Sequence, residues 1–451
     1  LGTNIKVADF VYVDIKNLSK IYPYSKLLKD ISIKDGKLSL IIKNDSDIEF
    51  NATINGLDFP LQKNNELITS LDIDGLIKGK NITISSVDGN IKIENNEKLK
   101  LFLKNIDIFI DTKKDNTNNL STEMEIYLDN SKVKIDDSIY NIKNGKINMT
   151  KKEIKFDATV IDVDIPLKKG NKSIEELDVL GTYNKDITLL NTKNDDLMLE
   201  LKKDSLSLKI DGYDIYYSSS DDKINKNDFK NISIIGKNSN IFVNEIHKVL
   251  ADNYEIRIRE DSKYVHLEHK KTNITLKESK DRKIDFYSND IDEEFVNALF
   301  NKNILDGGNI MLLANGYMND LNGKLIIENS NINDLAILNN LLIFIHTSPG
   351  LINPLLAIPS VVGMATNSGF NLTAYKIVNG ALEFNYNNDN EILDIKKLVT
   401  VGNGIDFDGK GKVNLKDMTL ESNIKLIFLK DYSKIVGMIP VVNYVLLGDN
   451  N

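Results

Sequence analysis

The sequence contains no cysteine and only four histidines in 451 residues. A disulfide framework and a thiolate metal site are therefore excluded, and the chain is indifferent to the redox state of its compartment. His266 and His269 lie in one alternating run, so their rings are expected on opposite faces, where they cannot share a metal ion. We expect solvated or hydrogen-bonded histidines and no cofactor.

Catalytic motifs are also lacking. The sequence has no Gly-x-Ser-x-Gly elbow and no Ser/His/Asp set with supporting context. Glycines 402, 404, 409 and 411 superficially suggest a phosphate loop, but they lead into an alternating Val-Asn-Leu run and not into a helix, so we interpret them as turn glycines. The sequence therefore predicts a protein that is not an enzyme.

Positive charge is in short supply. Lysine and arginine number 57 against 66 acidic residues, which gives a formal net charge of −9 and a pI of about 5.2. This balance argues against nucleic acid as a partner, because phosphate binding needs a basic surface. With 41% hydrophobic and 27% charged residues, the chain can nevertheless bury a substantial core.

A long hydrophobic run is missing too. The segment 335–375 has no charged residue, but asparagines and prolines interrupt it, whereas a spanning helix needs about 20 uninterrupted apolar residues. Two interpretations remain open: apolar helices packed against a sheet, or helices that dip into a membrane interface. The residues that would contact the membrane are Leu341, Leu342, Ile343, Phe344, Leu355, Leu356, Val441, Val442 and Leu446.

The dominant pattern between residues 31 and 276 is strict alternation of apolar and polar residues in short runs. Examples are the runs 38–40, 206–210 and 274–276, which are separated from their neighbours by Asn, Asp and Gly. Half-buried antiparallel strands have this pattern, with one apolar and one polar face. We therefore expect a mainly β protein.

Part of the pattern repeats along the chain. The stretch from Lys34 to Leu61 recurs from Lys143 to Leu167, and weaker copies share an aspartate between apolar residues. These marker aspartates, at positions 58, 107, 164 and 214, are spaced by 49, 57 and 50 residues. A period near 50 predicts an elongated array in which each unit buries its face against its neighbours. The apolar parity changes at each marker, so we expect a bulge or a tight turn there.

Few helices are predicted. Residues 290–300 have a helical pattern, with Asp290 and Glu293 at capping-box spacing. Two further helical regions are expected to open near Asn333 and near Asp431.

The C-terminal third resembles a known family. Its glycine-rich strands and its apolar ending, in which Ile439-Pro440 precedes Leu446-Leu447-Gly448, are similar in order to the AsmA-like C-terminal region of bacterial envelope proteins, in the branch of YhdP and TamB. The segments that carry the resemblance are 307–310, 323–329, 378–382, 409–415 and 439–448.

The resemblance implies a β-sheet curled into a hydrophobic groove, along which phospholipids are thought to move between the inner and outer membranes of a Gram-negative bacterium. It implies two regions: a repetitive β-groove segment over 1–300, and an AsmA-like region with apolar helices over 301–451. It also implies the periplasm and an inner-membrane anchor. Because no basic stretch followed by an apolar one opens the sequence at Leu1, we expect that anchor in a segment that precedes it.

Elementary energetics point the same way. Apolar surface left in water costs about 25 cal/mol per Å², so a sheet with one apolar face must cover it. The predicted helices are too few for that, which leaves curling of the sheet and bound acyl chains. We expect the groove to be lined by Leu38, Leu40, Phe50, Ile54, Leu99, Leu101, Phe156, Val160, Leu206 and Leu208. The alternative is a structural scaffold or an assembly factor that binds a strand of an outer-membrane protein by edge addition, and this alternative predicts a filled core.

Overall fold

The computed structural model describes residues 10–18, 35–43, 47–56, 61–110, 123–135, 138–150, 152–163, 165–184, 186–217, 229–243, 247–332, 376–402, 405–414 and 419–428. The chain divides into two compact units. The first consists of Leu1–Ile165 with Ile174–Lys202, and the second of Pro166–Ser173 with Lys203–Asn451. Nothing in the structure tests the predicted division at residue 300, which stays a prediction.

The first unit is a ladder of hydrogen-bonded strands, as the alternating pattern predicts. Its strands follow one another in the order β1 (Phe10–Ile15), β2 (Asp35–Lys43), β3 (Ile48–Asn55), β6 (Ser70–Lys78), β7 (Asn81–Ser86), β8 (Ile91–Asn95), β9 (Leu99–Lys104), β11 (Met124–Ile135), β12 (Ser138–Met149), β13 (Ile154–Ile161), β16 (Glu176–Tyr183), β17 (Ile187–Thr192) and β18 (Leu197–Lys202).

One join in this ladder is parallel, which corrects the expectation of a wholly antiparallel sheet. Strands β9 and β11 run in the same direction, with Leu101 opposite Ile126. Between them the chain makes the short strand β10 (Asp107–Ile110) and then returns, so the next ladder strand starts from the same end. The sheet is therefore mixed.

Short strands outside the ladder lie along one side of it, and we call them straps. In the first unit the straps are β4 (Leu61–Lys63), β5 (Glu66–Leu67) and β10, and β10 pairs with β4 and with the far end of β11. Leu61 and Ile106 pack in one apolar cluster with ladder residues such as Leu103. The straps therefore cover part of the apolar face of the sheet.

The marker aspartates lie where the chain leaves the ladder. Asp107 begins β10, and its carboxylate accepts a hydrogen bond from the Lys132 backbone N–H at 2.9 Å. Asp214 begins β20 (Asp214–Tyr217) and accepts one from the Asn240 backbone N–H at 2.7 Å. The prediction was a bulge or a tight turn, and the chain bends two residues before each of these markers, at Asn105 and Gly212, both with positive φ. After the bend it departs into a strap, and the aspartate caps the backbone of a neighbouring segment. Asp58 and Asp164 lie outside the described residues.

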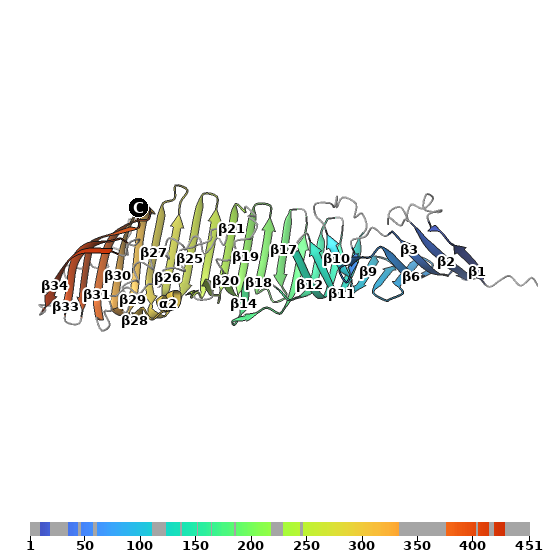
Figure 1. Ribbon diagram of the computed structural model, residues 1–451, viewed down its shortest axis with the longest axis horizontal. Coiled ribbons are helices and arrows are strands. Elements are labelled where there is room, and N and C mark those ends of the chain that lie inside the picture. Colours follow the sequence, from blue (N-terminus) through green and yellow to red (C-terminus); the bar gives the residue numbers. More distant parts are fainter. Residues whose placement is uncertain are drawn as a thin grey trace, which may run out of the picture. The chain divides into compact units, whose positions relative to one another are not determined.

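The second unit has a ladder of the same kind, with its strands side by side in Figure 1. Its order is β19 (Ser205–Asp211), β21 (Asn231–Lys237), β24 (Asn253–Arg259), β25 (Ser262–His269), β26 (Thr272–Glu278), β27 (Ile284–Asp292), β29 (Asn309–Tyr317), β30 (Asp320–Ile332), β31 (Lys376–Asn387), β32 (Ile392–Gly402), β33 (Ile405–Asn414) and β34 (Thr419–Phe428). Strands β19 and β21 form a second parallel join.

The straps of the second unit form a small sheet of their own. It contains β14 (Leu167–Lys169), β15 (Lys172–Ser173), β20, β22 (Ile241–Val243) and β23 (His247–Val249). A further short strand, β28 (Leu305–Asp306), pairs with β30.

Part of the strand pattern repeats about 106 residues later in the chain. The buried residues Leu61, Ile73 and Ile91 correspond to Leu167, Val179 and Leu197, which are also buried. The strand pattern thus recurs over two of the marker intervals.

The described residues contain one helix, α2 (Glu293–Phe300). The prediction of a helix here is confirmed, but its cap is Asp292, whose side chain accepts a hydrogen bond from the Phe295 backbone N–H at 2.9 Å. Asp290 sits instead in the irregular end of β27 with φ of 48°. The sequence pattern predicted the start of the helix too early, because it contains no sign of this irregularity in β27.

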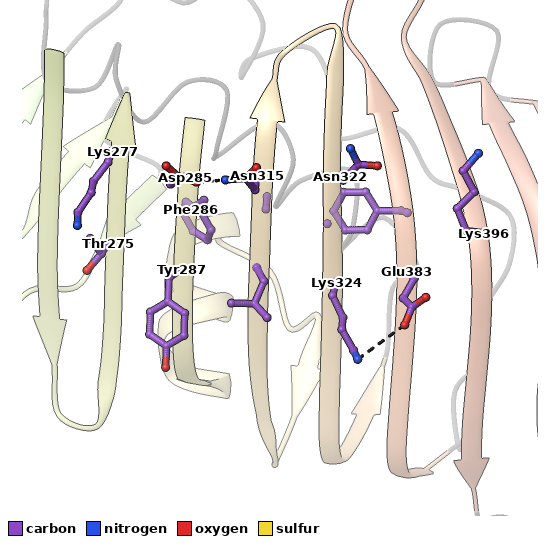
Figure 2. A pocket seen from close by; sticks show the side chains of 14 residues that line it. Thr275, Lys277, Asp285, Phe286, Tyr287, Asn315, Asn322, Lys324, Glu383 and Lys396 are labelled. Atoms are coloured by element: carbon purple, nitrogen blue, oxygen red, sulfur yellow. Dashed lines mark hydrogen bonds and ion pairs between the residues drawn. The ribbon is translucent and has the colours of Figure 1, made fainter. Parts of the chain in front are cut away.

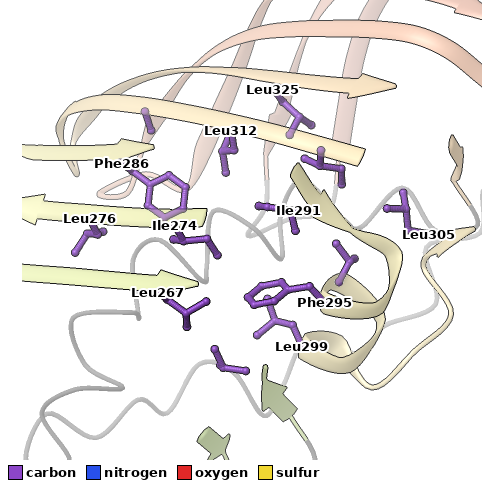
Figure 3. Packing of buried hydrophobic residues seen from close by; sticks show 14 of the residues in the cluster. Leu267, Ile274, Leu276, Phe286, Ile291, Phe295, Leu299, Leu305, Leu312 and Leu325 are labelled. Carbon is purple, nitrogen blue, oxygen red and sulfur yellow. The ribbon is translucent and has the colours of Figure 1, made fainter. Parts of the chain in front are cut away.

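Helix α2 closes the core of the second unit. Phe295 and Leu299 point from α2 toward the strand residues Leu267 and Ile274 (Figure 3), and Phe295 is 1% exposed. The other predicted helical regions, near Asn333 and Asp431, lie outside the described residues, so the apolar C-terminal helices are not shown. Among the described helical residues, no helix has the length and apolar character needed to cross a membrane.

Candidate functional site

Strand register shows that one face of the first unit's ladder is apolar, and we call it the inner face. Across neighbouring strands Leu40 lies opposite Phe50, Ile93 opposite Leu101, and Ile147 opposite Phe156. The middle row of this face runs through Leu40, Phe50, Gly75, Ile84, Ile93, Leu101, Ile126, Ile147, Phe156, Gly181, Leu190 and Leu199.

The opposite face, the outer face, is polar because side chains alternate along each strand. Asn51 and Thr53 on β3 donate hydrogen bonds to Asp74 and Asp72 on β6, the latter at 2.6 Å. On β9 and β11 the outer face carries Phe102 stacked on Tyr127, with ring centroids 4.7 Å apart. Lysines 92 and 146 lie over the two rings, so even the outer aromatics are flanked by charge. The two faces therefore differ sharply in polarity.

The ten residues predicted to line a groove all lie on inner faces. Eight belong to the first unit, on β2, β3, β9 and β13, while Leu206 and Leu208 lie on the inner face of β19 in the second unit. All ten are half-buried, and Leu101, Phe156 and Val160 pack against the core cluster of the first unit. Whether they contact lipid stays a prediction. Ile84, Ile147 and Leu190 share the face and show the same alternation, but they are not among the predicted lining residues.

Burial on the inner face of the first unit changes from one side to the other. The row beside the straps is buried, as at Ile73, Leu103 and Val179. Leu103 and Val179 share an apolar cluster with the strap residue Leu61. The middle row is largely half-buried. The row farthest from the straps includes Leu99, which is half-buried, and Tyr183, which is 51% exposed. The inner face is thus closed on the strap side and accessible on the other.

Polar contacts hold the strap side in place. Lys63 on β4 forms an ion pair of 2.6 Å with Asp88 in the turn between β7 and β8. Ser86 also donates to Asp88 and accepts from the Ile91 backbone N–H at 2.9 Å. Hydrogen bonds from Lys63 and Ser86 hold the pKa of Asp88 well below its usual range. The turn therefore keeps a carboxylate that anchors the strap to the ladder.

Glycines in the ladder give aromatic rings room on the inner face. Gly181 lies opposite Phe156, and a Cβ added to it would lie 1.9 Å from the ring atom Cζ. Gly75 and Phe50 make the same arrangement, with 2.0 Å between the added Cβ and Cζ. Each ring thus lies flat over the neighbouring strand and covers the backbone that the glycine leaves bare. This packing keeps the inner face apolar and holds the aromatic rings against the strands.

A separate hollow of about 650 Å³ lies in the second unit on β26 to β32 (Figure 2). Its charged lining residues, such as Lys277, Asp285 and Lys324, alternate with inner-face residues, so they belong to the outer face. Lys324 pairs with Glu383 at 3.7 Å, and Asn315 donates to Asp285. The lining carries charges of both signs, and the hollow is not the predicted apolar site.

The histidines have hydrogen-bond partners in the described residues. His266 contacts the Thr275 hydroxyl at 3.1 Å, His269 the Asp252 carboxylate at 3.2 Å, and His247 the Leu299 carbonyl at 3.0 Å. His346 lies outside the described residues. No group of three or more His, Asp or Glu residues within the described ranges could hold a metal ion.

The predicted turn glycines belong largely to strands. Gly402 ends β32, and Gly409 and Gly411 lie inside β33, so the prediction of turns is wrong for these three, while Gly404 lies outside the described residues. A Cβ on Gly411 would come within 2.7 Å of the Glu421 carbonyl oxygen on the adjacent strand. The close approach of β34 explains why glycine occurs there.

The nine residues predicted to contact a membrane, from Leu341 to Leu446, lie outside the described residues.

Comparisons with known proteins gave a match to a protein family. Searches of curated proteins and of solved structures each gave no significant match. The sequence model described as YhdP protein matches residues 11–451, which include every described strand of both ladders except the first residue of β1. This chain therefore belongs to the YhdP family of bacterial envelope proteins.

Proposed function

We propose that the protein is a non-enzymatic, lipid-binding groove that shields phospholipid acyl chains and moves them between the inner and outer membranes during envelope biogenesis. The observation that carries this proposal is the half-buried apolar middle row of the first unit, bounded on one side by straps. Family membership supports the same function, and it also supports a periplasmic location with attachment to the inner membrane.

The energetic argument rests on surface that water would otherwise contact. Middle-row residues such as Leu101 and Phe156 are half-buried in the chain by itself. Each Å² of apolar surface that an acyl chain removes from water contributes about 25 cal/mol. Leu, Ile and Phe side chains offer no hydrogen bonds that would fix a headgroup or a polar ligand. An unbranched hydrocarbon chain therefore fits this face better than any polar molecule.

The proposal can be tested with lipid that copurifies with the full chain. Leu101→Asp places a charge in the middle row of the inner face, while Thr83→Asp places one on the outer face of the same unit. We expect native mass spectrometry to show bound phospholipid on the wild type and on Thr83→Asp, and little on Leu101→Asp. Equal lipid on both variants, or none on the folded wild type, would contradict the proposal.

A second candidate function is a structural scaffold or an assembly factor for outer-membrane proteins. One observation favours it: the inner face of the second unit is buried from β26 to β30, as a filled core requires. Strand addition at an edge such as β34 would then be the mode of binding. A chain that carries no lipid but captures an outer-membrane β-strand peptide would favour this candidate.

A further inference from the structure

The inner face of the second unit carries one ion pair among its apolar residues. Among the paired residues of the ladder from β19 to β30, Lys263 and Glu278 are the charged side chains that register places on this face. Lys263 alternates with Val265 and Leu267, and it lies directly opposite Glu278. The pair therefore faces the same side as the hydrophobic core.

The carboxylate of Glu278 holds two cations. Its Oε2 atom lies 2.9 Å from Lys263 Nζ, and its Oε1 atom lies 2.7 Å from Arg282 Nη1. Glu278 is 8% exposed and Lys263 16%, whereas the Arg282 side chain is 72% exposed. Burial raises the pKa of Glu278, but hydrogen bonds from Arg282 and Lys263 outweigh that effect and leave the pKa below its usual range. The cluster thus has a net charge of +1.

The cluster of Lys263, Glu278 and Arg282 lies where burial of the inner face changes along the ladder. On β19 and β21 the inner face is half-buried at Leu206, Leu208 and Ile234. From β26 onward it is buried, as at Leu276 and Phe286. The cluster lies between these stretches, at the row farthest from the straps, where Lys263 pairs in register with Ile258. Along this row the side chains are half-buried from Leu206 to Lys263 and buried at Glu278 and Ile284, whereas in the next row burial begins at Ile256 on β24.

Stability gives no reason for a charge pair here. Removing two charges from water costs several kcal/mol per ion, and apolar residues of similar volume often stabilise a core at least as well. Leucine at both positions would continue the apolar row of Ile258 and Ile284. A buried ion pair with an excess positive charge, at the end of an apolar surface, calls instead for an anionic group as its partner.

We propose that Lys263, Glu278 and Arg282 form a binding site for the phosphate ester of a lipid headgroup. Arg282 supplies a planar fork of donors that fits phosphate oxygens, and Lys263 adds a second cation. Glu278 is a positioning residue that holds both cations at the edge of the inner face. The acyl chains then lie on the half-buried row of this face that runs through Leu206, Ile232 and Ile258. This site rests on the proposed function, because it needs acyl chains on that face.

The test uses the full chain and three soluble probes: dihexanoyl phosphatidylglycerol, dihexanoyl glycerol and inorganic phosphate. The variant is Arg282→Met, which changes an exposed side chain. Its matched control is Arg259→Met, an exposed arginine at the preceding turn of the same ladder. Dissociation constants are measured by calorimetry at equal ionic strength, because charge contacts weaken with salt.

We expect Arg282→Met to bind the phospholipid about tenfold more weakly, which is the effect of one hydrogen bond between charged groups. Binding of dihexanoyl glycerol should not change, and Arg259→Met should behave as the wild type. The inference is overturned if both arginine variants lose the same affinity, or if Arg282→Met stays within twofold of the wild type. It is also overturned if inorganic phosphate binds as tightly as the phospholipid, because the site would then serve free phosphate.

The two proposals fail in distinguishable ways. If neither dihexanoyl lipid binds the wild type, the acyl-chain function itself is contradicted. If dihexanoyl glycerol binds the wild type as tightly as the phospholipid does, the inner face holds acyl chains but the cluster recognises no phosphate, and the headgroup site alone is rejected.

Discussion

The two units share one alternating sequence pattern, but they bury the apolar residues of that pattern to different extents. Nine buried apolar residues form the core cluster of the first unit, and twenty-eight form that of the second, counted over the described residues. Leu101 and Leu312 both lie on inner faces, but Leu101 is half-buried and Leu312 is 0% exposed. Alternation therefore decides which face is apolar, and it does not decide whether that face is covered.

The difference comes from the elements outside the ladder. In the first unit the straps β4, β5 and β10 cover the row beside them. In the second unit α2, with Phe295 and Val296, packs together with β22, β23 and β28 on the inner face. An open apolar face suits a ligand, whereas a closed one serves as a core.

Truncating a core residue should show the largest difference. Leu312→Ala should destabilise the second unit by about 3 kcal/mol, since it leaves a cavity in a fully buried site. Leu101→Ala should cost the first unit about 1 kcal/mol, because its side chain is already partly in water. Hydrogen exchange of the amides in β29 and β9 measures the two losses separately. Equal losses would mean that the first unit is as closed as the second.

Replacing the glycine of an aromatic–glycine pair should destabilise the protein less than truncating a core residue does. The loss should again be larger in the second unit than in the first. Gly323→Ala should cost about 2 kcal/mol, because the added Cβ would lie 2.1 Å from Cζ of Phe384, which is 2% exposed and has no room to move. Gly181→Ala should cost less than about 1 kcal/mol, because Phe156 can swing toward the accessible side. Thermal unfolding of each variant measures the effect, and a larger loss for Gly181→Ala would refute an open inner face.

Protonation of Glu278 should give the smallest effect, and it acts on the second unit. The folded pKa of Glu278 lies below its ordinary value of 4.5. As the pH falls, the unfolded chain takes up this proton first, so the stability that Glu278 contributes is complete above about pH 4.5 and is lost as the pH falls through the folded pKa. Amide protection in β26 and β27 should fall in that range. The control Glu278→Gln should lack this pH dependence, and an unchanged dependence in it would assign the effect to another group.

Much of the fold could be predicted from alternation. The strands that contain residues 38–40, 206–210 and 274–276 form, and their apolar residues share one face, because a period of two is a local property of the chain. Membership of the AsmA-like branch, inferred from ordered motifs after residue 300, is confirmed by the match to the YhdP family.

Other features could not be predicted, because they depend on distant contacts. Asp107 signalled a break in the pattern, but the pairing of β10 with Leu61 joins residues that are far apart in sequence. The parallel joins have no local signal for the same reason. Burial of Leu312 depends on α2, and alternation in β29 looks no different from that in β9. The ion pair of Lys263 and Glu278 was visible only once the register was known.

The central claim, that the inner face of the first unit holds lipid, is tested most directly by photo-crosslinking in living cells. Benzoylphenylalanine replaces one phenylalanine at a time: Phe156 on the inner face, Phe102 on the outer face of the same unit, or Phe286 in the closed core of the second unit. We predict phospholipid adducts at position 156, and few at positions 102 and 286. Adducts at position 102 as frequent as at 156, or none at 156 in the folded protein, would contradict the account.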